Sequence, residues 1–142
     1  MDTKILDIRT RSTSEKGSLS FLEAGKDIDF EIKRFYYTYG ATKDTQRGGH
    51  AHKTLRQLLF CPYGEIKIIL DDGKDKVEVL LDSPEKALIV EEKIWSDIIW
   101  LKDNSVLFAA ASNFYDENDY IRNYDDFIAF LENEASDNDD WV

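Results

Sequence analysis

The chain contains a series of short segments in which apolar and polar residues alternate, and turn signals separate them. Residues 65–70 alternate cleanly, as a half-buried strand does because successive side chains point to opposite faces. Asp72-Gly73 is a strong hairpin signal, and the alternation resumes over residues 77–81. Further short strands are predicted at residues 2–11, 19–23, 30–39, 50–60, 87–90, 94–101 and 106–111. Strands with turns at this spacing predict an all-β fold, an antiparallel jelly-roll sandwich or barrel.

Helical periodicity is found only near the C-terminus. Asp125 and Asp126 suit the first turn of a helix, and apolar residues follow at helical spacing from Phe127. We therefore expect one short C-terminal helix to close the barrel. Residues 1–142 are expected to form a single domain, with a flexible acidic tail over about 132–142.

Composition excludes several classes of partner. The net charge of −11 makes the chain as a whole a poor match for nucleic acid or an anionic membrane surface. Cys61 is the only cysteine, so neither an intrachain disulfide nor a thiolate metal cluster is expected. No apolar run approaches the ~18 residues of a membrane span, and no signal-peptide core is found at the N-terminus. These features predict a cytoplasmic protein.

The segment Arg47–Lys53, with the sequence RGGHAHK, holds the only two histidines of the chain. His50 and His52 are two residues apart, so on a strand both imidazoles would point to one side of the sheet. Two imidazoles on one wall indicate either a metal site or proton-transfer chemistry. Alternatively, the two histidines have no catalytic or binding role and simply make their hydrogen bonds within a polar core.

A metal site requires more donors than the sequence offers. In jelly-roll barrels of the cupin type, a His-x-His pair is joined by a carboxylate and by a third histidine from a later strand. Here Gln57, a neutral amide, stands at the carboxylate position, and the chain has no third histidine. Since iron and zinc sites need about three or four good donors, no metal is predicted.

Proton transfer requires fewer groups. A free imidazole has a pKa of about 6.5 and can accept and return protons near neutrality. Removal of a proton next to a ketone also needs donors that stabilise the developing enolate oxygen. Arg47, Gln57 and tyrosine hydroxyls are candidate donors. Gly48 and Gly49 allow either a sharp turn or a close approach to a ligand.

Several segments in a specific order resemble the sugar 3,4-ketoisomerases, which are small cupins that act on thymidine-diphosphate-linked (dTDP-linked) 4-keto-6-deoxyglucose. The segment RGGHAHK is preceded by FEIKRFYYTYG and followed by Gln57, by LDDG at 70–73 and by the C-terminal YDENDYIRNYDDF. The resemblance extends roughly from residue 19 to residue 127.

The resemblance implies a cofactor-free and metal-free reaction. The 4-keto sugar would become its 3-keto isomer through an enediol. The product would supply an aminotransferase that makes a 3-amino-3,6-dideoxyhexose for a surface polysaccharide, such as an O-antigen lipopolysaccharide or an S-layer glycan. A homodimer is expected from the same resemblance.

The resemblance also implies roles for individual residues. His50 matches the catalytic base and His52 its companion in hydrogen bonding or proton relay. Tyr37 is the preferred pocket member of the aromatic strand, with core packing as the alternative. The residues expected to bind substrate are Arg47, Tyr39, Gln57, Gly49 and Lys53.

Four residues have roles that the sequence leaves open. Tyr120 and Arg122 match the C-terminal motif of the family, and their role could be structural or related to the dimer. Arg34 and Arg56 are weaker candidates for binding a diphosphate, because such residues are more often solvated surface charges.

Two other functions compete with ketoisomerisation. One is a 3,5-epimerase of the same deoxysugar class, which would share the fold and also use a histidine base. The other is a cupin without catalytic activity that binds a nucleotide sugar.

Overall fold

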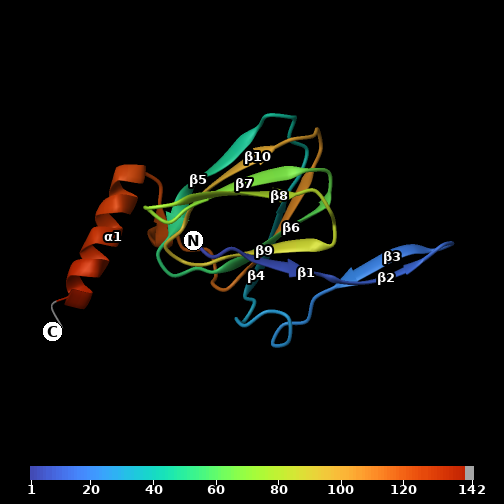
Figure 1. The fold of residues 1–142 in the computed structure, drawn as a ribbon, viewed down its shortest axis with the longest axis horizontal. Helices are drawn as coiled ribbons and strands as arrows, with labels where there is room; N and C mark the ends of the chain where they lie inside the picture. Colours follow the sequence, from blue (N-terminus) through green and yellow to red (C-terminus); the bar gives the residue numbers. More distant parts are fainter. Residues whose placement is uncertain (140–142) are drawn as a thin grey trace.

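The computed structural model describes residues 1–139 and consists mainly of antiparallel strands in two facing sheets (Figure 1). The first sheet has the order β1 (Lys4–Asp7), β9 (Lys86–Val90), β6 (Gln57–Tyr63), β11 (Val106–Ala111) and β4 (Arg34–Thr38). The second has the order β12 (Tyr120–Ile121), β5 (Gln46–His52), β10 (Trp95–Trp100), β7 (Ile66–Asp71) and β8 (Lys76–Leu81). The predicted all-β jelly-roll architecture is confirmed.

Two elements lie outside the facing sheets. The hairpin of β2 (Arg9–Thr13) and β3 (Gly17–Phe21) extends from one end of the barrel, and helix α1 (Tyr124–Asp139) lies at the other end (Figure 1). The helix is longer than predicted, since it continues through residues 132–139 of the expected flexible tail. The last part of that expected tail, residues 140–142, lies outside the described residues. No helix of the described chain is long and apolar enough to cross a membrane.

The interior between the sheets is apolar over much of its length. On the predicted hairpin, Ile66 pairs with Leu81 and Ile68 with Val79, and all four side chains are buried. Trp100 is fully buried beside them and donates a 2.8 Å hydrogen bond from Nε1 to the carbonyl oxygen of Ser105. The predicted alternation therefore places the apolar faces of β7 and β8 in the core, where burial of each large side chain stabilises the fold by about 1.5–3 kcal/mol.

The expected strand over residues 50–60 is wrong. The strand that carries His52 ends there, and a new strand begins at Gln57 in the opposite sheet. Backbone amides of Thr54 and Leu55 in the turn between them donate to the carboxylate of Asp119. No local signal in the sequence identifies this turn, because the turn is fixed by a distant carboxylate.

Strand β4 has two different faces. Arg34, Tyr36 and Thr38 point toward the interior between the sheets, whereas Phe35 and Tyr37 are 63% and 61% exposed on the outer side. Phe35 and Tyr37 therefore share the outer face.

Candidate active site

The two histidines are held side by side by β5. The ring centroids of His50 and His52 are 5.1 Å apart and nearly perpendicular, so the predicted placement on one face is confirmed. The backbone before them is irregular, and the pairing of β5 with β10 shifts register between Ser96 and Asp97. Gly48 has a φ of +82°, and a Cβ there would lie 2.7 Å from the carbonyl oxygen of Ser96. This glycine is therefore required by a turn and by a close approach to the neighbouring strand.

A pocket of about 290 Å³ opens between the two sheets in front of His50. Its walls come from five strands and from the segment that precedes α1. The residues that line it are Arg34, Tyr36, Thr38, Arg47, Gly48, His50, Gln57, Ser96, Ile98, Trp100, Leu107, Tyr115, Tyr120 and Arg122. The pocket thus combines an apolar floor with imidazole, amide, phenol and guanidinium groups.

Tyr36 and Gln57 form a polar pair across the first sheet. The Tyr36 hydroxyl donates a 2.6 Å hydrogen bond to Oε1 of Gln57, whose side chain is buried. Burial, with a smaller contribution from Tyr120, raises the pKa of Tyr36 to about 12, so the phenol remains protonated and remains a donor. Because its oxygen is occupied, the amide of Gln57 is left with its NH₂ group as a donor.

His50 is unprotonated at neutral pH. Burial is the main cause that lowers its pKa to about 4, and His52 and Arg122 act in the same direction. Its Nδ1 is buried and has no hydrogen-bond partner among the described residues. An imidazole in this state can accept a proton from a ligand in the pocket.

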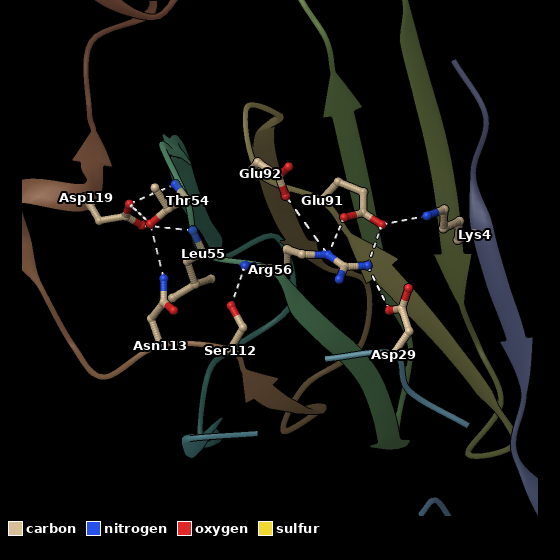
Figure 2. Close-up of polar contacts among 10 residues, drawn as sticks. All are labelled: Lys4, Asp29, Thr54, Leu55, Arg56, Glu91, Glu92, Ser112, Asn113 and Asp119. Atoms are coloured by element: carbon tan, nitrogen blue, oxygen red, sulfur yellow. Dashed lines mark hydrogen bonds and ion pairs between the residues drawn. The ribbon is translucent and has the colours of Figure 1, made fainter. Parts of the chain in front are cut away.

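His52 lies behind His50 and contacts a carboxylate. Nδ1 of His52 is 3.0 Å from Oδ2 of Asp119, and the ring also lies against Tyr120 with a centroid distance of 4.4 Å. Burial lowers the pKa of His52, and the hydrogen bond to Asp119 partly opposes this effect. Figure 2 shows how Asp119 also reaches Thr54 and Leu55 of the turn after β5.

Three arginines give the pocket positive charge within an acidic protein. Arg34, Arg47 and Arg122 line it, and none of the described lining residues is acidic. Arg122 is paired with Glu117 through contacts of 2.8 and 3.1 Å, and its guanidinium lies 4.3 Å from the centre of the Tyr120 ring. Nε of Arg34 is buried without a partner among the described residues, so this donor is available to an anionic ligand.

Several of the residues predicted from sequence meet at this site. His50, Arg47 and Gln57 line the pocket, and His52 lies directly behind His50. The open question about the C-terminal motif is also answered in part, since Tyr120 and Arg122 both line the pocket.

Other predicted residues lie elsewhere. Tyr37 and Tyr39 are 61% and 70% exposed on the outer face, so their expected placement in the pocket is wrong. Lys53 is exposed beside α1 rather than in the pocket. Gly49 adjoins Asp97, and it is Gly48 that lines the pocket. For Tyr37 and Tyr39 the cause is that a strand pattern gives the period of the side chains but not which face is the inner one. Lys53 lies beyond the end of β5 at His52.

Arg56 also has a structural position. Its guanidinium bonds Glu91 at 3.0 Å and Asp29 at 2.8 Å, and Glu91 in turn bonds Lys4 (Figure 2). This network ties the start of β6 to β1 and to the end of β9. It is separate from the pocket, so Arg56 is not placed to bind a ligand there.

Sequence reasoning missed three contributors to the site. These are Tyr36, Tyr115 and Asp119. The alternation over β4 shows that Arg34, Tyr36 and Thr38 share a face, but it does not show that this face is the inner one. No local signal identified Asp119, which is 67 positions from His52.

Among its described residues, the pocket lacks a set of side chains suited to a metal ion. Among the side chains that the structure describes, those of residues 1–136, no group of three or more from His, Cys, Asp or Glu is arranged to hold a metal ion. His50 and His52 would need partners, but Gln57 has its oxygen engaged by Tyr36 and arginines surround the site. The donor set therefore does not suit a cationic metal.

The chain is similar to known proteins over nearly its whole length. The family described as "WxcM-like, C-terminal" (FdtA) matches residues 1–132. The TDP-4-oxo-6-deoxy-alpha-D-glucose-3,4-oxoisomerase of Aneurinibacillus thermoaerophilus is 39% identical over 131 residues, which cover 92% of this chain and 94% of that protein.

Solved structures give the same result. A 3,4-ketoisomerase from Helicobacter canadensis matches with a TM-score of 0.89 and 39% identity, covering 93% of this chain and 98% of that one. A histidine-to-asparagine mutant of the 3,4-ketoisomerase QdtA from Thermoanaerobacterium thermosaccharolyticum, in complex with TDP-4-keto-6-deoxyglucose, matches with a TM-score of 0.85 and 35% identity. That match covers 89% of this chain and 91% of the QdtA chain. The chain therefore belongs to the FdtA (WxcM-like) family of sugar 3,4-ketoisomerases.

Proposed function

We propose that this protein converts a TDP-linked 4-keto-6-deoxyglucose to its 3-keto isomer, with His50 as the base. The observation that carries the proposal is the position of His50, an unprotonated imidazole that faces a positively charged pocket. The names of the relatives and the sugar nucleotide bound to the QdtA mutant support this choice of substrate.

The proposed reaction is an internal tautomerisation that needs no oxidant or reductant. The base removes the proton from carbon 3, a double bond forms between carbons 3 and 4, and the oxygen at carbon 4 gains a proton. The resulting enediol loses the proton on the oxygen at carbon 3 as a carbonyl forms there, and carbon 4 gains a proton. Each proton that the sugar loses is taken up by an acid–base group of the pocket and replaced by another, so protons and electrons balance.

The other pocket residues have roles that follow from their chemistry. Arg47 and Arg34 offer guanidinium groups to the diphosphate, for which a planar fork of donors is well suited. The NH₂ group of Gln57, held in place by Tyr36, is available to stabilise an enolate oxygen. No step requires a metal or an organic cofactor.

Isotope labelling tests the reaction directly. The protein is incubated with the TDP-linked 4-keto-6-deoxyglucose in deuterated water, and the proton spectrum is followed. Ketoisomerisation predicts a new 3-keto sugar labelled at carbon 4. Label at carbons 3 and 5 with inverted configuration would indicate a 3,5-epimerase instead, and saturable binding without turnover would indicate a cupin that only binds nucleotide sugars.

Substitution of the base provides the second test. His50→Asn should lower kcat by at least about 100-fold, because a general base typically contributes about 10²–10⁴-fold to the rate. Binding of the sugar nucleotide and the far-UV circular dichroism spectrum should be retained. Substantial turnover by the folded variant would contradict the assignment of His50.

We also propose that the protein is a homodimer that buries the outer aromatic face of the first sheet. Phe35, Tyr37 and Tyr39 are more than half exposed, and the rings of Phe35 and Tyr37 lie 5.8 and 6.2 Å from that of Phe108. A contiguous apolar patch of this kind favours a protein interface. Light scattering should give twice the chain mass of 16.5 kDa, and Phe35→Glu should shift the population to the monomer.

The product of this reaction has a carbonyl at carbon 3, where a transaminase could introduce an amino group. We therefore place the enzyme before a sugar aminotransferase, in the formation of a 3-amino-3,6-dideoxyhexose. Coupling the purified protein to such an aminotransferase should yield an aminated sugar nucleotide only when His50 is intact.

A further inference from the structure

The carboxylate of Asp119 is nearly buried and is directed at one nitrogen of His52. Oδ2 of Asp119 lies 3.0 Å from Nδ1 of His52, and the two side chains are only 10% and 7% exposed. An ionised carboxylate can only accept hydrogen bonds. The proton of a neutral His52 is therefore on Nδ1, and its Nε2 is unprotonated.

The position of the carboxylate is fixed by other donors. Oδ1 of Asp119 accepts from the Thr54 amide at 2.8 Å and from the Thr54 hydroxyl at 2.7 Å, and Oδ2 accepts from the Leu55 amide at 3.3 Å. Burial alone would raise the pKa of Asp119, but the hydrogen bonds from Thr54 and His52 outweigh it and lower the pKa. Asp119 is thus held in one orientation and in its charged form.

The backbone provides a separate connection at the same place. The Lys53 amide donates to the carbonyl oxygen of Asp119 at 2.9 Å, and β12 pairs Tyr120 with His52. These backbone contacts attach the C-terminal segment to β5 without the side chain of Asp119. The two segments are therefore joined even without the carboxylate of Asp119, so joining them does not account for its presence.

On its other side, His52 adjoins the site. Its ring lies edge-on to His50, with the 5.1 Å centroid separation given above, and His50 faces the pocket. When His50 takes a proton from the sugar, its ring becomes positively charged. A neutral His52 does not repel the charged ring of His50, and its free nitrogen can accept a proton from it. The negative charge of Asp119 stabilises the protonated ring, whether the proton is on His50 or on His52.

We propose that Asp119 is a positioning residue of this site, which holds His52 in the Nδ1–H tautomer and so keeps Nε2 free for proton transfer with His50. The proposal rests on the proposed ketoisomerase function. It deepens that function by adding Asp119 and His52 to the group that controls the base.

The variant Asp119→Asn changes the tautomer with little change in shape. The two Thr54 donors face the Oδ1 position, so the amide oxygen of asparagine is favoured there. The NH₂ group then takes the Oδ2 position, where it donates to Nδ1 of His52 and forces the proton onto Nε2, while the long 3.3 Å contact from the Leu55 amide is lost. Asp116→Asn is the matched control, because Asp116 belongs to the same segment but accepts from the Asn118 amide instead of His52.

Nitrogen NMR of the histidine rings reports the tautomer without any substrate. With only two histidines in the chain, the signals are assigned by comparison with His50→Asn. We expect Nδ1–H for His52 in the wild-type protein and in Asp116→Asn, and Nε2–H in Asp119→Asn. Nε2–H in the wild-type protein would overturn the proposal, and this measurement does not depend on how well any variant of Asp119 folds.

Steady-state kinetics provide the second readout. In Asp119→Asn we expect kcat to fall by about 10²–10⁴-fold, as for loss of a proton-transfer group, while KM stays close to that of the wild type. Asp116→Asn should retain normal kcat and KM. Wild-type activity in Asp119→Asn, or a loss confined to KM, would overturn the role of Asp119. A wild-type enzyme that does not turn over the sugar would instead refute the proposed function, whatever the tautomer of His52.

Discussion

The hydroxyl of Tyr36 donates a 2.6 Å hydrogen bond to the side-chain oxygen of Gln57, and the two residues come from different strands of the first sheet. This contact fixes the orientation of the Gln57 amide in the wall of the pocket. The oxygen of Gln57 is used within the protein, and its NH₂ group is presented to the ligand.

Tyr36→Phe should therefore damage the site, whereas Tyr37→Phe should not. Loss of the Tyr36 hydroxyl leaves the buried oxygen of Gln57 without its donor, which costs about 1–3 kcal/mol of unfolding free energy. We also expect kcat/KM to fall, because Gln57 loses its fixed orientation. The Tyr37 hydroxyl makes no hydrogen bond to a described residue, so Tyr37→Phe, which keeps the ring, should change the free energy of unfolding by less than about 0.5 kcal/mol. Urea denaturation and steady-state kinetics measure both effects, and equal effects of the two substitutions would contradict the orientation of β4.

Arg47→Ala and Lys53→Ala form a second matched pair. Arg47 lines the pocket and Lys53 does not, although both flank the histidines in sequence. Loss of a charge-assisted contact of about 1.5–3 kcal/mol predicts a TDP affinity roughly 10- to 100-fold weaker for Arg47→Ala. Calorimetric titration with TDP should show wild-type affinity for Lys53→Ala. A weaker Lys53→Ala would mean that the ligand extends beyond this pocket.

The pH dependence should reflect the lowered pKa of His50. This base acts when it is unprotonated, and burial together with His52 and Arg122 lowers its pKa to about 4. Plots of kcat/KM should stay level as the pH falls through about 6.5, the pKa of a free imidazole, and should decline only nearer pH 4. An acidic limb at the pKa of a free imidazole would contradict the burial of His50.

The lowered pKa of His50 also affects the stability of the fold, because the folded and unfolded chains bind protons at different pH. Between about pH 6.5 and pH 4 the unfolded chain binds a proton at this histidine and the folded chain does not. Acidification therefore favours unfolding in this window. Circular dichroism at each pH serves as the control that separates loss of the base from loss of the fold.

Chelation should leave the activity unchanged. The two imidazoles, an amide whose oxygen accepts from Tyr36 and the surrounding arginines form a poor set of metal donors. Enzyme treated with EDTA and exchanged into metal-free buffer should show the kcat of untreated enzyme, and added divalent ions should not increase it. Activity that is lost with EDTA and restored by one metal would refute the metal-free mechanism.

The features that could be predicted from sequence are those with local causes. The alternation over residues 65–70 and the Asp72-Gly73 turn identify the hairpin of β7 and β8. Two histidines at i and i+2 must share a face of a strand, and the structure confirms it. The lack of a third histidine and the amide at Gln57 can likewise be read from the sequence.

The features that only the tertiary structure decided depend on long-range contacts. Aromatic residues occur on both faces of β4, so period-2 spacing could not show that Tyr36 rather than Tyr37 faces inward. The turn after His52 is stabilised by Asp119, 67 positions from that histidine, and this distant contact also determines which nitrogen of His52 carries the proton. A strand pattern specifies which side chains lie together, whereas the packing of the second sheet against the first determines which of them meet at the site.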